Sequence, residues 1–193
     1  MKIRCSWVNM HNELYIKYHD EEWGVPSYND EKLFEMLVLE GMQAGLSWDI
    51  ILKKRENLRL AFDNFNARKI ADYDNDKINQ LLKDPGIIRN KCKIIAAIKN
   101  ANAYLWIKKE YPRFTEYIWQ FVSGIPIVNS WSIVSEIPVN SHQSDIMSKD
   151  LKKRGFSFVG STICYSFMQA VGMVNDHTVD CFRYHEINNK YNP

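Results

Sequence analysis

Apolar residues recur with a helical period along most of the chain, and the segment EKLFEMLVLEGMQA after Asp30 shows this most clearly. Its leucines, phenylalanine and valine fall on one stripe, which predicts a helix with Asp30 as its N-cap. A rotation of about 100° per residue places Glu40 at the edge of this stripe, close to Leu33 and away from Glu35. We therefore expect the Glu40 carboxylate to face the interior or a cavity that borders it.

The same period predicts further helices, several of which follow a residue that caps helix N-termini. Ser47 precedes WDIILKKRENLRLAF, Asp74 precedes DKINQLLK, and Asn90 precedes the long segment KCKIIAAIKNANAYLWIKKE. Further helices are predicted over residues 115–122, 144–155 and 161–174. Residues 124–139 are punctuated by prolines, which predicts an irregular connection with at most short β pairing. No long run has a strand period, so the predicted class is all-α.

The composition fits one folded unit over residues 1–193. A hydrophobic fraction of 46% supports a sizeable core, in which we expect Cys92 and Cys164 to lie. No stretch approaches the roughly 18 apolar residues that cross a bilayer, and the N-terminus lacks the apolar core of a secretory signal. The four cysteines then indicate a reducing compartment without disulfides, so we expect a cytoplasmic protein, and we expect it to be a monomer.

The net charge of +2 gives no general argument for nucleic acid, but the distribution of basic residues is informative. They cluster in KKREN (53–57), RNKCK (89–93) and KKRG (152–155). A single run of this kind is usually only a solvated face. Because all three fall at junctions between predicted helices, they predict a surface that contacts phosphates.

Cysteine and histidine occur near both ends of the chain, at Cys5 and His19 and again at His177 and Cys181. The second pair has i, i+4 spacing, which on a helical turn points both side chains the same way. Together the four residues make a Cys2His2 set, the usual arrangement of structural zinc, which would tie the two ends together. The spacing alone leaves open that they are unrelated buried residues.

The segment LLKDPGIIRNK connects two predicted helices through a tight turn at Gly86. Such a turn leaves the first backbone N–H groups of the next helix exposed at its positive end, where they suit a DNA phosphate. Arg89, Lys91 and Lys93 add positive charge at the same place. An ordinary helix turn is the alternative to a phosphate-binding hairpin.

Several long sequence blocks together identify a family. They are RCSWV (4–8), LYIKYHDEEWGVP (14–26), KLFEMLVLEGMQAGLSW (32–48), LKKREN (52–57), GIIRNKCKI (86–94) and LKKRGFSFVGSTICYSFMQAVGMVNDH (151–177). With these blocks in order over nearly its whole length, the chain resembles the type I 3-methyladenine DNA glycosylases of the helix-hairpin-helix superfamily. The resemblance implies an all-α helix-hairpin-helix glycosylase fold, with the hairpin at about 77–100 and a zinc site joining segments 1–25 and 165–190.

The resemblance also implies which residues form the site. The residues that match the family's structural zinc ligands are Cys5, His19, His177 and Cys181. Those that match the lining of its base pocket are Tyr15, Tyr18, Glu40 and Trp48. Those that match its DNA-contacting turn and hairpin are Gly45, Leu46, Gly86, Ile87, Arg89 and Lys91. Core packing is the alternative for each aromatic residue.

The function implied by this resemblance is hydrolysis of the N-glycosidic bond of 3-methyladenine in alkylated double-stranded DNA, with free 3-methyladenine as the product. The damaged base would be flipped into the pocket, where electron-rich rings stack on the cation. Glu40, the expected catalytic residue, would accept a hydrogen bond from the amino group and offset the positive charge. For Glu40 the alternative is a structural acid paired with a helix N-terminus.

The resemblance also limits the expected chemistry. Many relatives in the superfamily carry an aspartate downstream of the hairpin, where this chain has Lys108 and Lys109. No lysine nucleophile is evident, so strand-cleaving lyase activity is disfavoured. Thr162 and Ser166 are candidates to hold Glu40 in place. The rival functions are a non-catalytic reader of methylated DNA with the same fold and a zinc-stapled helical interaction module without a DNA role.

Overall fold

The computed structural model describes residues 2–191, so Met1, Asn192 and Pro193, which the predicted unit 1–193 includes, lie outside the described residues. The α-helices within this range are α1 (Glu13–Glu21), α2 (Asp30–Gln43), α3 (Trp48–Ala61), α4 (Ala67–Ala71), α5 (Asn75–Lys83), α6 (Lys91–Glu110), α7 (Phe114–Trp119), α8 (His142–Lys153), α9 (Ser161–Ala170) and α10 (Phe182–Tyr191). The short 3-10 helices are η1 (Asp63–Phe65), η2 (Gln120–Val122) and η3 (Val134–Glu136). The predicted all-α class is therefore confirmed, although the hydrophobic pattern gave no indication of α1, α4 or α10.

Two of the predicted N-caps are confirmed by side-chain hydrogen bonds. Asp74 accepts from a backbone N–H in the first turn of α5, and Asn90 does the same in α6. Ser47 occupies the N-cap position of α3, but its hydroxyl makes no capping hydrogen bond. The prediction for α2 is wrong by one residue, because Asn29 is the cap. The Asp30 carboxylate instead accepts from backbone N–H groups at the start of α7, which ties α7 to α2.

The helix predicted over 161–174 ends four residues early, at Ala170. The cause is Gly172, which has a φ of 70° and passes so close to the N-terminal segment that a Cβ there would lie 2.2 Å from the backbone nitrogen of Pro26. The chain then forms β2 (Val174–Asn175), which pairs in parallel with β1 (Ile127–Val128). This is the short β pairing expected within 124–139.

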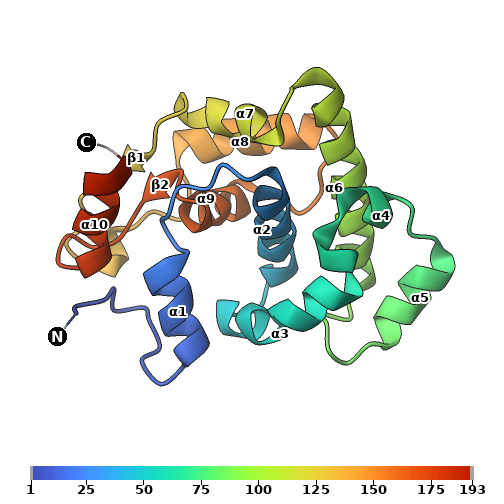
Figure 1. Cartoon of the computed structure of the whole chain (residues 1–193), viewed down its shortest axis with the longest axis horizontal. Helices are drawn as coiled ribbons and strands as arrows, with labels where there is room; N and C mark the ends of the chain where they lie inside the picture. The colour runs from blue at the N-terminus through green and yellow to red at the C-terminus, as the bar shows by residue number, and fades with distance from the viewer. Residues whose placement is uncertain (1, 192–193) are drawn as a thin grey trace.

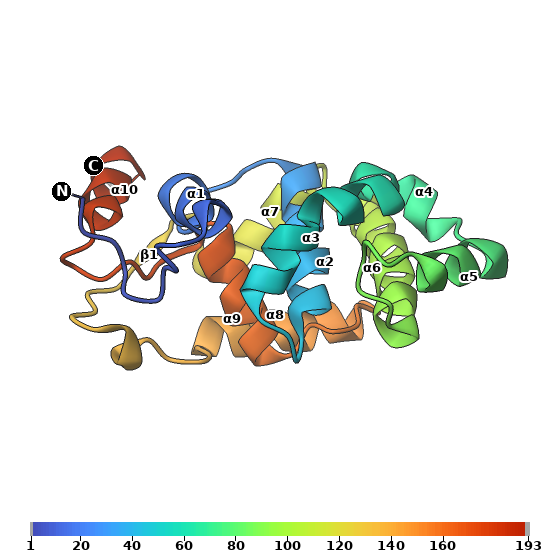
Figure 2. The same ribbon diagram turned by 90° about the horizontal axis from the view of Figure 1, so that it is seen from below.

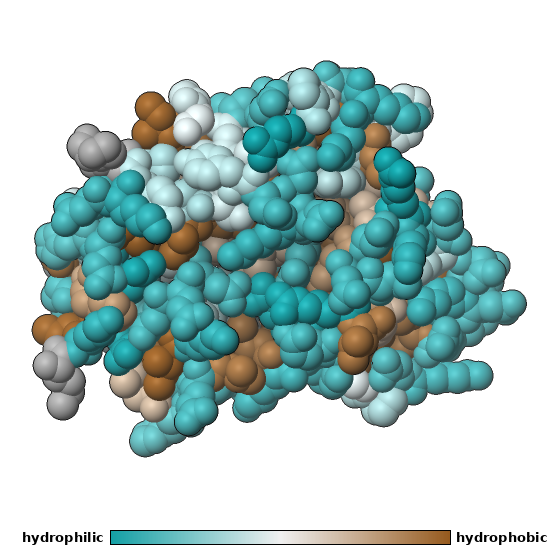
Figure 3. Space-filling view, viewed as in Figure 1, coloured by the Kyte–Doolittle hydropathy of each residue, from teal (hydrophilic) through white to brown (hydrophobic). Residues whose placement is uncertain are grey.

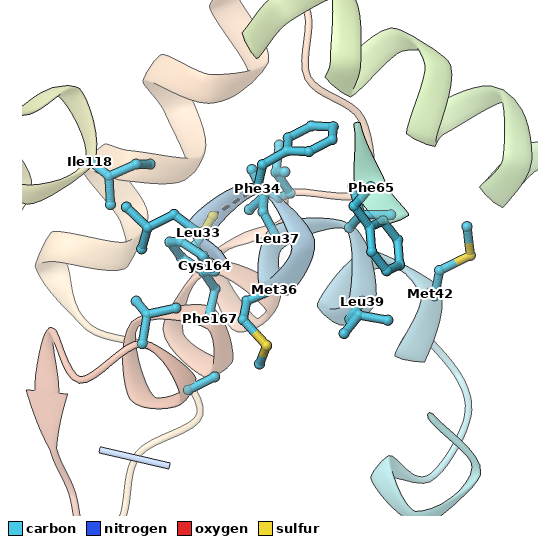
Figure 4. Close-up of a cluster of buried hydrophobic side chains, with 14 of the residues drawn as sticks. Leu33, Phe34, Met36, Leu37, Leu39, Met42, Phe65, Ile118, Cys164 and Phe167 are labelled. Carbon is cyan, nitrogen blue, oxygen red and sulfur yellow. Dashed lines mark hydrogen bonds between the residues drawn. The ribbon is translucent and has the colours of Figure 1, made fainter. Parts of the chain in front are cut away.

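Helix α2 is the centre of the core. It contacts α3, α6, α7 and α9, which surround it in Figure 1. Figure 4 shows Met36 of α2 on the side of Phe167 from α9 and Leu39 of α2 on the side of Phe65 from η1, and all four belong to one buried cluster. Because every residue from Met36 to Met42 is buried, Glu40 is a carboxylate on a helix that is apolar around most of its circumference.

Both termini lie at the same end of the molecule, beside α10 and near α1, whereas α4 and α5 lie at the opposite end (Figures 1 and 2). The face seen in Figure 3 is mostly hydrophilic, and apolar side chains reach it only in separate patches. Across residues 2–191, each helix is either too short or too polar to span a bilayer.

Candidate active site and metal centre

A cavity of about 390 Å³ lies between α1, the end of α2, the start of α3, α9 and residues 134–139. Its walls are mainly aromatic and apolar. The lining residues are Trp7, Tyr15, Tyr18, Trp23, Glu40, Gln43, Trp48, Val134, Ile137, Pro138, Val139, Thr162, Tyr165, Ser166 and Gln169. The structure therefore brings together all four residues predicted for a base pocket, which come from three different helices.

Glu40 reaches the cavity from the last turn of α2 and is only 3% exposed. Burial raises the pKa of its carboxyl group to about 8, because the charged form has lost its hydration. Within residues 2–191 no group hydrogen-bonds to this carboxyl, so pairing with a helix N-terminus is wrong. Thr162 and Ser166, the candidates to hold Glu40 in place, line the same cavity but form no hydrogen bond with its carboxyl group in the described range.

Aromatic rings form the rest of the wall around Glu40. The rings of Tyr18 and Trp48 lie 5.2 Å apart at a tilt of 48°, and the buried Trp48 indole N–H has no hydrogen-bond partner within residues 2–191. Tyr15 makes an edge contact with Trp7, which in turn packs against Trp23. Trp7 and Trp23 were not predicted as site residues, although both lie in the sequence blocks quoted above. Trp48 and Glu40, whose indole N–H and carboxyl group have no hydrogen-bond partner within residues 2–191, thus both line one aromatic cavity.

The connection between α2 and α3 makes a sharp turn next to the cavity. Gly45 has a φ of 74°, a conformation that side chains with a Cβ rarely adopt. The following Leu46 leaves 37% of its surface exposed at the tip of the turn. The residues predicted to enter the DNA are therefore on a protruding turn close to the cavity lining.

Lys93 supports this turn from the interior of the protein. Its ammonium group donates to the carbonyl oxygens of Met42, at 2.8 Å, and of Ala44, at 2.6 Å, and the residue is only 6% exposed. Both carbonyls belong to the C-terminal end of α2, where a cation is favourable. The prediction that Lys93 adds charge to the phosphate-binding hairpin is therefore wrong, because its charge is used inside the protein.

Residues 84–90 join α5 to α6 in the predicted hairpin. Gly86 fits closely here, since a Cβ would lie 3.0 Å from the Asp84 carboxylate and 3.2 Å from the Asn57 amide. Its N–H donates to that Asp84 carboxylate and is not free. Within residues 84–93, the backbone N–H groups without an acceptor are those of Ile88, Arg89, Lys91 and Cys92.

The side chains of the hairpin divide into buried and exposed ones. Ile87 is buried and anchors the loop to the core. Arg89 and Lys91 are exposed and form no ion pair with any described residue. Cys92 is exposed too, so the prediction that it belongs to the core is wrong, whereas Cys164 is buried as predicted. The hairpin thus presents two cations beside four free N–H groups.

The other two basic runs differ in how they lie relative to the hairpin, and the run 53–57 reaches it, because the Lys54 ammonium group donates to the carbonyl oxygen of Pro85 at 2.9 Å. In the run 53–57, Arg55 is buried and pairs with Glu22 and Glu35. Residues 152–155 border the far half of α6 beside Trp106, which is roughly 22 Å along the helix from its first residue. The expectation of one phosphate-contacting surface from three runs is therefore wrong for 152–155, whereas the half-buried Lys54 of the run 53–57 contacts the hairpin that carries Arg89 and Lys91.

The four predicted metal ligands form one buried cluster. The ligand atoms of Cys5, His19, His177 and Cys181 lie within 4.8 Å of one another. His177 Nδ1 lies 3.4 Å from both sulfur atoms, and His19 Nε2 lies 3.4 Å from the Cys181 sulfur. Tetrahedral zinc with ordinary bond lengths would separate its sulfur and nitrogen ligands by about 3.5 Å. The residues present therefore fit a tetrahedral metal ion, and His177 and Cys181 lie in the loop before α10 rather than on the helical turn that their spacing suggested.

Neighbouring groups orient the two imidazoles. His19 Nδ1 lies 2.8 Å from the Asp20 carboxylate, and His177 Nε2 lies 3.0 Å from the carbonyl oxygen of Trp23. Each ring thereby directs its remaining nitrogen at the cluster, as metal-binding histidines do. Contact with Cys5, reinforced by the imidazoles, holds the pKa of the Cys181 thiol far below its usual range, which favours the thiolate that binds metals.

The sequence as a whole matches known proteins over nearly all of its length. DNA-3-methyladenine glycosylase 1 of Escherichia coli K12 is 52% identical over 181 residues, which cover 94% of this chain and 96% of that protein. Residues 7–184 match the family model described as methyladenine glycosylase. The chain belongs to the methyladenine glycosylase family.

Solved structures confirm the fold of this glycosylase. A crystal structure of 3-methyladenine DNA glycosylase I superposes with a TM-score of 0.91 at 50% identity and covers 93% of this chain and 98% of that chain. A tyrosine-to-phenylalanine variant of 3-methyladenine DNA glycosylase I in complex with 3-methyladenine superposes with a TM-score of 0.90 at 34% identity, over 93% of this chain and 96% of that chain. The resemblance stated from the sequence blocks is therefore confirmed.

Proposed function

We propose that this protein hydrolyses the N-glycosidic bond of 3-methyladenine in alkylated double-stranded DNA and releases the free base. The observation that carries the proposal is the buried, unpaired Glu40 carboxyl in an aromatic cavity. We also propose that the enzyme acts as a monomer, because the residues of one chain are enough to line the cavity. The bound 3-methyladenine of the related structure supports the same ligand for this chain.

The chemistry of the lesion explains the cavity. Methylation at N3 makes the adenine cationic and weakens its bond to the sugar, so the leaving group is already activated. Tyr15, Tyr18 and Trp48 offer electron-rich faces to this cation, each contributing roughly 0.5–2 kcal/mol. Glu40 accepts a hydrogen bond from the exocyclic amino group and, once ionised, offsets the positive charge. A neutral base would not compensate a buried carboxylate, which favours the damaged base.

The cavity is reached only by a base that has left the duplex. Glu40 and Trp48 are too deeply buried to touch a stacked base, so the lesion must be extruded. The protruding Gly45–Leu46 turn is suited to fill the gap that the base leaves. Arg89 and Lys91, with the free N–H groups beside them, are suited to hold a backbone phosphate, while Gly86 and Ile87 keep the hairpin closed and anchored.

The proposed reaction stops at base release. A lyase needs an amine that forms a Schiff base with the sugar. Among the described residues that line the cavity there is no lysine, and the nearby Lys93 ammonium is fixed on α2 carbonyl oxygens. We therefore propose a monofunctional glycosylase that leaves the strand intact.

We propose that the Cys5, His19, His177 and Cys181 cluster holds one structural zinc ion. Four protein ligands leave no open position for water, so the ion stabilises the fold and takes no part in the reaction. It would join residues 2–25 to residues 165–190 and so make the chain one unit. That junction also fixes α1 and α9, the helices that carry Tyr15, Tyr18 and the far cavity wall.

The test is to incubate methylated duplex DNA with the protein and to identify the released bases by liquid chromatography and mass spectrometry. Release of 3-methyladenine with intact strands is expected, and strand nicks should appear only after alkaline treatment. Glu40→Ala should abolish most of the release, whereas Glu31→Ala, at an exposed position of the same helix, should not. Tight binding of lesion DNA without any released base would instead show a non-catalytic reader.

A further inference from the structure

Asp176 is a fully buried carboxylate at the back of the cavity wall, directly after β2. One of its oxygens accepts hydrogen bonds from the Asn129 amide and the Trp131 indole N–H. The other accepts from the Tyr165 hydroxyl and the Gln169 amide, and all four distances are 2.7 Å. Four donors converge on one side chain.

These contacts define the direction of each hydrogen bond. An indole N–H can only donate, and four donors use the acceptor capacity of an ionised carboxylate. No lysine or arginine among residues 2–191 forms an ion pair with Asp176, so neutral dipoles alone solvate its charge. The hydrogen bonds are therefore charge-assisted, and their orientation is strongly fixed.

Two of the four donors line the cavity proposed for the base, namely Tyr165 and Gln169. Because the hydroxyl proton of Tyr165 is donated to Asp176, that oxygen can only accept in any further hydrogen bond. The Gln169 amide likewise commits an N–H to Asp176, which fixes the plane of its carboxamide. Asp176 does not line the cavity itself, but it determines how the polar groups of Tyr165 and Gln169 in the cavity wall are oriented for hydrogen bonding.

The other two donors position a different wall. Asn129 and Trp131 precede η3, and the residues from Val134 to Val139 close one side of the cavity. The backbone of Trp131 is also held, since its carbonyl oxygen accepts from the N–H of Val179. One carboxylate therefore fixes both α9 and the approach to η3.

We infer that Asp176 is a positioning and specificity-determining residue, which orients Tyr165 as a hydrogen-bond acceptor toward the guest. The inference rests on the proposed function, because it concerns the ligand of the same cavity. A wall that accepts hydrogen bonds favours a purine cation with an exocyclic amino group. It disfavours a purine of the same shape that presents a carbonyl oxygen at that position, because two acceptors would then meet without a proton between them.

The experiment measures binding of two free bases by tryptophan fluorescence or calorimetry: 3-methyladenine, which has the amino group, and 3-methylhypoxanthine, which has a carbonyl group instead. The variants are Tyr165→Phe, Asp176→Asn and the double variant. Asp180→Asn, at an exposed position of the same segment, is the matched control. Metal content and the melting temperature are recorded for each variant.

The wild type should prefer 3-methyladenine strongly. Tyr165→Phe should reduce this preference about tenfold, and Asp176→Asn should reduce it similarly, because an asparagine amide can donate to Tyr165 and turn the hydroxyl proton toward the cavity. In the Tyr165→Phe background, Asp176→Asn should then reduce the preference no further. Asp180→Asn should leave the preference unchanged.

A purely structural role predicts a different pattern. Asp176→Asn would then weaken the binding of both bases equally, or would reduce the preference for 3-methyladenine as much in the Tyr165→Phe background as in the wild type. Either result would overturn the inference. If Asp176→Asn does not fold, Tyr165→Phe tests the inference by itself. An unchanged preference for 3-methyladenine in that variant would refute the role of the Tyr165 hydroxyl group. If the wild type binds neither base, the proposed function itself fails, which is a separate outcome.

Discussion

Replacing Glu40 by glutamine should make the protein more stable in alkaline solution while it weakens binding of the damaged base. The wild-type carboxyl is buried without a hydrogen-bond partner within residues 2–191, so ionisation is opposed by lost hydration. Glutamine has nearly the same shape and no charge. The variant therefore removes the cost of a buried anion and keeps the packing of α2.

The size and sign follow from the shifted pKa. The folded-state pKa of about 8 lies above the ordinary value of 4.5, so the folded protein holds a proton that the unfolded chain releases. The stabilising contribution of the protonated Glu40 is complete below pH 4.5 and is lost as the pH rises toward about 8. From about pH 5 to pH 9, the wild type should lose about 4 kcal/mol relative to Glu40→Gln.

The assay is urea unfolding of the two proteins at several pH values, followed by circular dichroism. Other titrating groups contribute equally to both proteins, so the difference between their unfolding free energies isolates Glu40. Glu31→Gln, at an exposed position of the same helix, is the control and should show no such trend. In parallel, Glu40→Gln should bind free 3-methyladenine about tenfold more weakly, because a neutral amide replaces a charge-assisted acceptor.

A difference between wild type and Glu40→Gln that stays constant from pH 5 to pH 9 would refute the reasoning. It would mean that Glu40 does not change its protonation state in this range and that the cavity solvates its charge. If the difference depends on pH but the affinity for 3-methyladenine is unchanged, the raised pKa of Glu40 would be supported. The proposed hydrogen bond between Glu40 and the base would then be refuted.

Three further predictions concern the metal and the DNA-facing surface. Cys5→Ser should lower bound zinc on elemental analysis from about one ion per chain toward none, with a lower melting temperature; full zinc content would contradict the cluster. Lys93→Met should destabilise the protein by about 1–3 kcal/mol in urea unfolding and weaken DNA binding, because two α2 carbonyl oxygens lose their donor, whereas the exposed Lys99→Met should do neither. Replacing Arg89 and Lys91 by alanine should reduce the slope of log affinity against log salt by about 2, and an unchanged slope would exclude them as phosphate contacts.

The family could be recognised from the sequence alone, because long blocks of specific residues in a fixed order can be read without knowing the fold. The inward direction of Glu40 was also predictable, since the helical period fixes the angle between residues on one helix. Capping residues located the starts of α5 and α6, because those hydrogen bonds join residues three positions apart. These features depend on local geometry, which the order of residues determines.

Charge partners were predicted badly for the opposite reason. Lys93 belongs to a basic run in the sequence, yet its ammonium group lies on carbonyl oxygens some fifty positions earlier in the chain, those of Met42 and Ala44. Arg55 is likewise neutralised by Glu22 and Glu35. A run of charged residues can be read from the sequence, but the carboxylates and carbonyl oxygens that pair with these residues are brought near them only by folding.

The sequence by itself determined the helical class, the inward position of Glu40 and the four Cys and His residues available to a metal. Only the tertiary structure decided that Glu40 has no partner, that Lys93 supports the Leu46 turn, and that Asp176 stands behind Tyr165. Periodicity acts within one helix, whereas burial, pKa and hydrogen-bond direction depend on groups that different helices bring together. For this protein the residue types of the site are therefore a property of the sequence, and their protonation and orientation are properties of the fold.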